Sequence, residues 1–596
     1  MLLIKPFLII DLISALWTIF VVTALFVWLP MASFSSGVKT NAVQILGLWL
    51  RIMSLIVVGV LSLSYFDLLN WITLVLWYGG CLFFNYYKSY RLGIKHCQEF
   101  AKEKIVNLID ILDSGLSITD VIKDVKNSCQ KSVQRSLNYL SNLIDERGIL
   151  FIVLLTIILI FAILTRWQYS LLELRFSQPD NYGILLITRQ ILTRNYPHTD
   201  LTVFPALAAT ISLLGSIEPM QTIRFFSPII GVVLVISLGY VVWVFLDNVY
   251  SALIAMFALG IYLFTWAISI DRPWITTIID SLNNSLIRQW AGNELELGVI
   301  FLLLSLGYCF SCDRAVCQTI TFKFNLGCCV VLILLTAPPL LIILAISSIG
   351  LIGDKKLTLI TITLAWIILA VFAAMAGDRL TWLQGFLLTL PVAFSFLTGI
   401  LFTIVSSILK TLSPKWAETF CLGLIFSFSL NFWLPNSPKI TYLEYDIAAR
   451  KSIELNRLFP TKTWTLVAPV EQLAEIYGSG WYQDLALFVE QYAVKATKPQ
   501  FNFPISDDLF IMVEKVPFVT FPDEPDILPD SILGDRTYGY YRSTAGRASL
   551  EYEALRMCEK YRLHHPDSDI YYEDEKLRIY HFKQTISYSH VLIKTV

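Results

Sequence analysis

Long apolar segments recur along the whole chain, and they are the feature that most limits how it can fold. Most are long enough, at a helical rise of ~1.5 Å per residue, to cross the ~30 Å hydrocarbon core of a bilayer. Of the 596 residues, 56% are hydrophobic and only 15% are charged. The sequence therefore predicts a mainly α, polytopic membrane protein with about 11–12 membrane segments. The predicted segments are 7–30, 43–67, 69–87, 149–165, 226–246, 249–269, 297–312, 326–352, 357–376, 382–409 and 417–434.

Net charge and cysteine content exclude some classes of function. The formal net charge is −1, so bulk charge gives no sign of a nucleic-acid partner. The first apolar segment has no small-residue cleavage site after a short core, and we expect it to be a retained span. Ten cysteines are scattered, mostly in apolar segments or predicted cytoplasmic loops, where disulfides are not expected. Cys309, Cys312 and Cys317 are closely spaced, but no fourth ligand for zinc lies nearby, so small residues at a helix end are the preferred interpretation.

Basic residues set the predicted orientation. Residues 88–148 contain ten Lys and Arg among acids and helically spaced Ile and Leu, which by the positive-inside rule indicates a cytoplasmic insert. A solvated helical pair and a partner-binding module both fit this insert. The next span then runs outward, which places loops 166–225 and 271–296 outside. We interpret 326–352, broken by Pro338-Pro339, as two short segments, because one kinked span would put the later lysines outside.

The tail, 435–596, is then extracytoplasmic and long enough for a domain of its own. Alternating runs predict strands at 463–468 and 508–516 and a hairpin at 571–582, with a helix at about 548–562. We expect a small α/β domain. The chain thus divides into a three-span module (1–87), the insert (88–148), a membrane core (149–434) and the tail.

The first outer loop reads ELRFSQPDNYGILLITRQIL from Glu173. In it Asp180 and Tyr182 precede an amphipathic helix, and Pro205 opens a second short helix. This order resembles the first extracytoplasmic loop of GT-C fold membrane glycosyltransferases, the polyprenyl- or dolichyl-phosphate-sugar-dependent class that includes protein mannosyltransferases and lipid A aminoarabinose transferases. In that class an acidic DE-x-Y-Y-like motif stands here, two interfacial helices follow, and an Arg opens the next span.

The resemblance covers about residues 149–434 and has two departures. Asp180 and Tyr182 match the second acid and the first aromatic of the motif, and Arg224 matches the Arg. Pro179 stands where the first acid would be, and Ala337 replaces the Lys of an "LLTKPP"-like break. The resemblance implies a GT-C type core in the plasma (inner) membrane. It also implies transfer of a sugar from a polyprenyl-phosphate carrier to a lipid, polysaccharide or protein acceptor on the outer face; no local string encodes the sugar or the acceptor.

Such a transfer needs a carboxylate for the acceptor and positive charge or a metal for the departing phosphate. The resemblance makes Asp180 the principal carboxylate, and an Asp before a helix also serves as an N-cap. Glu173 and Asp271 are further acid candidates, which equally fit charges that end a span. A single carboxylate is compatible with a divalent metal ion or with none. The candidates for donor and phosphate binding are Tyr182, Arg224, Arg272 and Arg288, and arginines at span ends also reach toward lipid headgroups.

Two other classes of function remain open. One is a non-catalytic membrane scaffold whose tail binds an envelope partner. The other is a transporter, against which the predicted spans hold almost no ionisable residue apart from Arg51. An enzyme, unlike a scaffold, requires Asp180, Asp271 and an arginine to converge on one outward-facing cavity that is also open to lipid.

Overall fold

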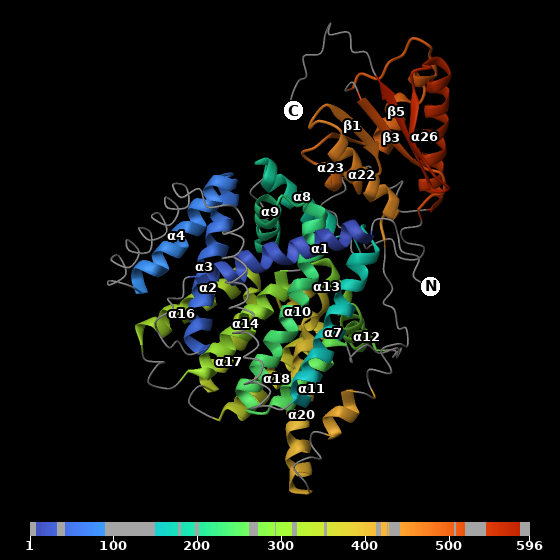
Figure 1. Ribbon diagram of the computed structural model, residues 1–596. Coiled ribbons are helices and arrows are strands. Elements are labelled where there is room, and N and C mark those ends of the chain that lie inside the picture. The colour runs from blue at the N-terminus through green and yellow to red at the C-terminus, as the bar shows by residue number, and fades with distance from the viewer. Residues whose placement is uncertain are drawn as a thin grey trace.

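The computed structural model describes fourteen stretches of the chain, and all structural statements concern these. They are residues 8–32, 42–89, 149–176, 180–196, 202–261, 272–292, 294–312, 319–350, 354–412, 419–425, 427, 442–505, 508–518 and 544–583. The predicted insert lies outside them from residue 90 onward, and so does most of the predicted last span, 417–434. Figure 1 shows a bundle of helices with a smaller domain of strands and helices at one end.

Helices make up the whole of the larger part. In chain order they are α1 (Leu8–Thr23), the π-helix η1 (Ala24–Trp28), α2 (Leu29–Ala32), α3 (Ala42–Tyr65), α4 (Trp71–Ser89), α7 (Ile149–Leu172), α8 (Asp180–Thr193), α9 (Val203–Gly215), α10 (Pro219–Leu246), α11 (Val249–Gly260), α12 (Pro273–Asn283), α13 (Ser285–Ala291), α14 (Glu294–Ser311), α16 (Ile320–Thr336), the 3₁₀-helix η2 (Pro338–Leu340), α17 (Leu341–Gly350), α18 (Lys355–Ala376), the 3₁₀-helix η3 (Gly377–Leu383), α19 (Gln384–Leu388) and α20 (Leu390–Leu412).

Seven of the described helices are long and apolar enough to cross a membrane, and this confirms the prediction of a mainly helical, multi-pass protein. They lie at Ile10–Trp28, Val43–Tyr65, Leu150–Leu172, Pro219–Leu246, Glu294–Ser311, Lys355–Ala376 and Leu390–Leu409. Shorter apolar helices account for five more segments, at Trp71–Phe83, Val203–Gly215, Val249–Gly260, Ile320–Thr336 and Pro338–Ser348. The break predicted at Pro338-Pro339 is confirmed, because α16 and α17 are separate helices joined by η2.

Two predicted span boundaries are wrong. The sequence predicts a span from residue 226, but α10 begins at Pro219, where the side chain of Glu218 accepts the amide of Gln221 as an N-cap. Arg224 therefore lies inside α10. Likewise α7 was expected to end at 165, but it continues to Leu172 and carries Arg166 fully buried.

Arg166 is buried with most of its guanidinium donors engaged, because they satisfy the end of a short helix. Its guanidinium donates to the carbonyl oxygens of Gly260 (3.0 Å) and Leu259 (3.2 Å), the last residues of α11. These carbonyls have no partner within their own helix. A guanidinium at the negative end of a helix dipole is stabilised there, which explains a charge that hydropathy alone does not predict.

The two predicted helices of the first outer loop, α8 and α9, are present. Eleven residues of α9 are buried, since it packs against α1, α3, α8 and α10. In α8 the polar residues Asn181, Thr188 and Arg189 are buried. Figure 1 shows both helices at the end of the bundle that carries the smaller domain.

The smaller domain is built on a five-stranded sheet in the order β2-β1-β3-β5-β4. β1 is parallel to β2 and β3, whereas β5 is antiparallel to β3 and β4. The predicted strands and hairpin are confirmed as β1, β3, β4 and β5, and the predicted helix as α26. The elements are α22 (Asp446–Leu458), β1 (Trp464–Ala468), α23 (Gln472–Ile476), β2 (Trp481–Asp484), α24 (Leu485–Tyr492), the 3₁₀-helix η4 (Lys495–Thr497), β3 (Asp508–Glu514), α26 (Thr544–His564), β4 (Asp569–Glu573) and β5 (Leu577–Lys583).

Helices cover both faces of this sheet. Leu466 and Phe510 point to a core shared with Ala448 and Leu455 of α22. The alternate residues of the same strands join a second core with α24 and α26. Because both faces are covered, β1 and the middle of β3 carry successive apolar residues, and this pattern predicted them as strands.

Candidate functional site

A pocket lies where the C-terminal domain meets the end of α7. Its volume is about 630 Å³, which is within the range of small-molecule sites. Carboxylates, two cations and aromatic rings line it together. The lining residues are Glu173, Arg175, Tyr442, Tyr445, Asp446, Ile447, Phe518, Asp574, Glu575 and Lys576.

The end of α7 fixes the bundle side of the pocket. The amide of Glu173 donates to the carbonyl of Tyr169 (3.0 Å), so the helical turn holds Glu173 at the rim. Arg175 then turns toward the domain, and its guanidinium donates to the carbonyl of Glu444 (2.7 Å). The same guanidinium lies 3.5 Å from the ring centroid of Tyr442 and 3.4 Å from a carboxylate oxygen of Glu173. The cation thus joins the two sides of the pocket.

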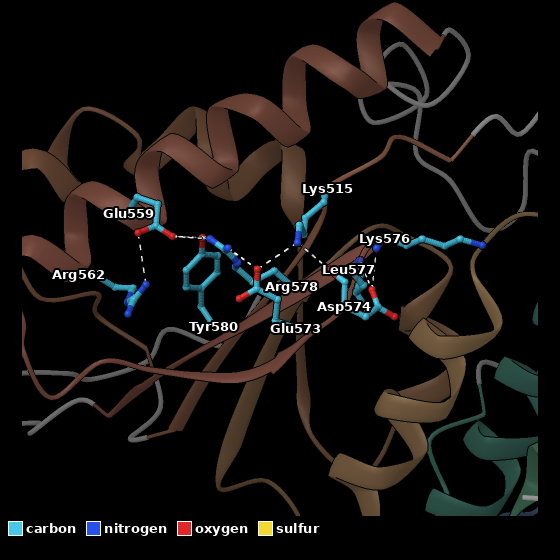
Figure 2. Close-up of polar contacts among 9 residues, drawn as sticks. All are labelled: Lys515, Glu559, Arg562, Glu573, Asp574, Lys576, Leu577, Arg578 and Tyr580. Carbon is cyan, nitrogen blue, oxygen red and sulfur yellow. Dashed lines mark hydrogen bonds and ion pairs between the residues drawn. The ribbon is translucent and has the colours of Figure 1, made fainter. Parts of the chain in front are cut away.

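The turn between β4 and β5 fixes the opposite wall. The Asp574 carboxylate accepts the amides of Lys576 and Leu577, both at 2.7 Å. Lys515 donates to the carbonyl of Asp574 at 2.7 Å. Figure 2 shows this turn beside a row of ion pairs on the hairpin, and shows the side chain of Lys576 extending away from that row. The Lys576 ammonium reaches to 5.1 Å from the ring centroid of Tyr445.

A buried group of carboxyls lies next to the pocket. The hydroxyl of Tyr182 on α8 donates to Glu444, and the side-chain amide of Gln472 donates to the other oxygen of Glu444 at 2.6 Å. Glu475 of α23 lies beside Glu444, and both are fully buried. Burial together with the neighbouring carboxylate raises the pKa of Glu444 well above its usual range, and burial raises that of Glu475 to about 7.

Arg224 is close to the pocket but is held in an ion-pair chain. Its guanidinium lies 2.9 Å from Asp11 of α1 and also donates to the carbonyl of Ser170. Asp11 lies 3.7 Å from Arg450 of α22, which in turn pairs with the pocket residue Asp446 at 2.7 Å. Arg224 is 2% exposed, so it is placed to hold three helices together and is out of reach of solvent.

The remaining candidates from the sequence do not line this pocket. Asp180 is the first residue of α8 and is exposed, and desolvation of its carboxyl raises its pKa. Arg272 is exposed at the N-terminus of α12. Arg288 is buried in α13, where it donates to the carbonyl oxygens of Ser281 and Leu388. Asp271 lies outside the described residues. The structure therefore brings together Glu173, Tyr182 and, through Asp11, Arg224, but not Asp180.

No set of three or more His, Cys, Asp or Glu side chains is arranged to hold a metal ion in the stretches that the structure describes. Of the three closely spaced cysteines, Cys309 is buried and Cys312 is half-buried near the end of α14, and Cys317 is outside those stretches. The carboxylates of the pocket are engaged by Arg175, Arg450 and backbone amides.

Most polar residues of this site were missed by the sequence analysis, among them Arg175, Tyr442, Glu444 and Asp446. The sequence nevertheless contains a pattern that could have identified them. The string YLEYD from Tyr442 holds the first acids after the last apolar segment, just as Glu173 and Arg175 follow the end of α7. Acids and aromatics that follow two spans ending on the same side of a membrane are brought to the same surface.

None of the models of known protein families matches the chain, and no curated protein matches it either.

Proposed function

We propose that the chain is an integral membrane glycosyltransferase that moves a sugar from a polyprenyl-phosphate carrier to a lipid, polysaccharide or protein acceptor. The observation that carries the proposal is the pocket at the domain junction. Its carboxylates accept hydrogen bonds from hydroxyl groups, and its rings Tyr442, Tyr445 and Phe518 offer flat apolar surface. This combination suits a sugar, and Glu173 is the carboxylate on the membrane side of the pocket.

The position of the pocket also fits a lipid-linked donor. It lies at the end of α7, where the helix leaves the membrane core, so a ligand there is within reach of a chain anchored in the bilayer. The start of α11 and the end of α20 lie together at the opposite end of the bundle. There the side-chain amide of Asn248 donates to the hydroxyl of Ser406 at 3.2 Å. Lys355 and Lys356 open α18, which packs against α20 and is joined to it through η3 and α19. A return of the chain through this short connection puts the lysines at the end opposite the pocket, which favours a cytoplasmic side for them and an extracytoplasmic side for the pocket.

A non-catalytic scaffold is the second candidate, and one observation favours it. The charged groups at the junction are largely engaged with one another, as Arg224 is with Asp11 and Arg175 with the Glu444 carbonyl. Asp180, the carboxylate expected from the GT-C resemblance, does not line the pocket. A junction that only holds a domain in place needs nothing further.

Transfer of label from polyprenyl-phosphate sugars in membranes tests the proposal. We expect the wild-type chain to give labelled product and Glu173→Gln to lower the rate ~100-fold or more, because the amide can neither accept a proton nor hold a metal. Asp180→Asn tests the carboxylate implied by the resemblance in the same assay. Asp280→Asn changes an exposed acid on α12 and is the matched control.

The outcomes separate the candidates. A loss with Glu173→Gln but not Asp180→Asn assigns the chemistry to the junction pocket, and the reverse assigns it to the start of α8. Equal transfer by all variants leaves an enzyme whose site is elsewhere. No transfer by the wild type over a broad panel of donors favours the scaffold.

A further inference from the structure

The carboxyl pair of Glu444 and Glu475 lies in the contact between the helical bundle and the C-terminal domain. We call this domain the outer domain below, after its predicted side of the membrane. Glu444 precedes α22, Glu475 lies on α23, and Tyr182 reaches them from α8. α23 packs directly on α8. Gly478, just after α23, approaches so closely that an added Cβ would lie 2.3 Å from Cγ2 of Thr193 at the end of α8. The pair is therefore sealed from water by elements of both parts.

Hydrogen bonding shows that the pair cannot carry two negative charges. Glu444 accepts from Tyr182 and Gln472, so its two oxygens each have a donor. Both carboxyl oxygens of Glu475 are buried, and the Ser452 hydroxyl faces them without completing a full hydrogen bond in the part of the chain that the structure describes. A buried carboxylate so poorly supplied with donors is costly, whereas one proton shared with Glu444 makes a hydrogen bond between the two carboxyls.

The neighbouring arginines do not compensate a second negative charge on the pair, because each already has an acidic partner. Arg189 of α8 faces Glu475, but it is already ion-paired with Glu218 at the start of α10. Glu471 adds negative charge from the turn before α23 and is itself paired with Arg547. The titratable, charged and polar groups that face the pair from the packed elements are Tyr169 of α7, Tyr182 and Arg189 of α8, Glu218 before α10, Ser452 of α22, and Glu471 and Gln472 at α23.

We propose that the contact of α8 with α23 is closed while Glu444 and Glu475 share one proton, and that it loosens when that proton is lost. Ionisation of both groups would place two like charges side by side in a water-excluded space with donors for only one. Separation of α23 from α8 admits water and relieves that repulsion. The outer domain is thus held to the bundle in a proton-dependent way, whichever reaction the pocket serves.

The sign of the pH dependence follows from linkage. Both carboxyls have their pKa raised in the closed contact, so the closed form binds more protons than the open form. The stabilisation is fully present below the ordinary pKa of about 4.5 and is lost as pH rises, and for Glu475 the loss extends to about pH 7. For Glu475 the gap from 4.5 to about 7 spans ~2.5 pH units, which corresponds to roughly a three-hundredfold change in the opening equilibrium.

Opening of this contact reaches the pocket directly. The carbonyl of Glu444 is the acceptor for Arg175, and the flanking residues Tyr442, Tyr445 and Asp446 are part of the pocket wall. Movement of Glu444 therefore breaks the bridge between the two sides of the pocket. Protonation of this pair therefore controls the shape of the pocket, because Glu444 is the sequence neighbour of the pocket residue Tyr445.

Hydrogen exchange of the full-length chain in nanodiscs, corrected for the intrinsic pH dependence of exchange, tests the proposal. Between pH 4.5 and 8.5 we expect the protection of α8 and α23 to fall by roughly three-hundredfold or more in the wild type. The amides of β3 and β5 should keep theirs, because the sheet does not depend on the pair. Glu475→Gln places a neutral amide that can donate to Glu444 at every pH, so it should remain protected at pH 8.5.

Glu490→Gln, an exposed acid on α24, is the matched control and should behave as the wild type. Wild-type protection of α8 and α23 that does not change with pH would overturn the proposal. So would a response in Glu475→Gln equal to that of the wild type. If Glu475→Gln does not fold, Glu444→Gln makes the same comparison, and the wild-type titration alone still decides whether the contact responds to protons.

Discussion

One arginine holds three carboxyls inside the outer domain. Arg547 of α26 is fully buried and donates to both oxygens of Glu514 at 2.8 Å, while Glu471 lies 3.5 Å away. Glu551 accepts the backbone amide of Glu514 at 2.8 Å, and burial together with the Glu514 charge raises its pKa well above the usual range. Because Glu551 stays protonated, Arg547 faces two carboxylates and not three, and the cluster joins α26 to β3 and to the turn before α23.

Removal of Arg547 should therefore be costly. Arg547→Leu leaves Glu514 and Glu471 buried without their cation, and we expect a loss of ~3–5 kcal/mol in the stability of the domain. Arg556→Leu changes an exposed arginine on the same helix and should stay within ~0.5 kcal/mol of the wild type. Thermal unfolding of the purified full-length chain measures both. A shift for Arg547→Leu no larger than that of Arg556→Leu would show that the buried cluster does not stabilise the domain.

At the scale of elements, the close approach of α23 to α8 depends on one glycine. Gly478 has φ of +83°, a region that side chains rarely adopt, and its missing Cβ leaves room for Thr193. Gly478 belongs to the turn that follows α23, and this turn is also a point of contact with the bundle.

Gly478→Ala should weaken this contact for two separable reasons. The left-handed φ costs ~1 kcal/mol and the clash with Thr193 adds to it. Thr193→Ala removes the clashing methyl, so the double variant should recover the second part and keep the first. Gly79→Ala on α4, where a Cβ meets nothing within 4 Å, is the control. Hydrogen exchange at α8 and α23 is the readout, and equal protection in Gly478→Ala and wild type would contradict the expected clash.

Elements with strong periodicity were predictable, and those that depend on distant partners were not. β1, β3 and β5 lie within apolar or alternating runs and were found from the sequence, as was α26. β2 was missed, since Trp481–Asp484 is a short edge strand whose identity comes only from pairing with β1. The end of α7 was missed because Arg166 looks like a loop residue until its acceptors on α11 are known.

The candidate site was predictable in part for the same reason. Glu173 and Tyr182 were singled out from their positions after a span and before a helix, and both lie at the junction. The role of Arg224 was not predictable, because its partner Asp11 lies over two hundred positions earlier in the chain. No local string reveals that Glu444 lies against Glu475, since only the packing of α22 and α23 on α8 brings them together.

At the scale of the whole molecule, α1, α7, α8 and α10 meet the outer domain at one end of the bundle (Figure 1). Asp11 links Arg224 to Arg450, and Arg175 links α7 to the segment before α22. These contacts place the first helix, the core and the tail in one arrangement. The N-terminal part of α1 and the outer domain must therefore lie on the same side of the membrane.

This arrangement makes a topological prediction. Leu563 at the end of α26 is 82% exposed, and Lys355 opens α18 at the opposite end of the bundle. With lysines on the cytoplasmic side, a membrane-impermeant maleimide should label Leu563→Cys in intact cells and Lys355→Cys only after permeabilisation. The unmodified chain gives the background from its own cysteines. The reverse pattern would place the outer domain and its pocket in the cytoplasm, which would exclude transfer on the outer face. Labelling of both sites from the same side would contradict the placement of Lys355 and the C-terminal domain at opposite ends of a bundle that spans the membrane.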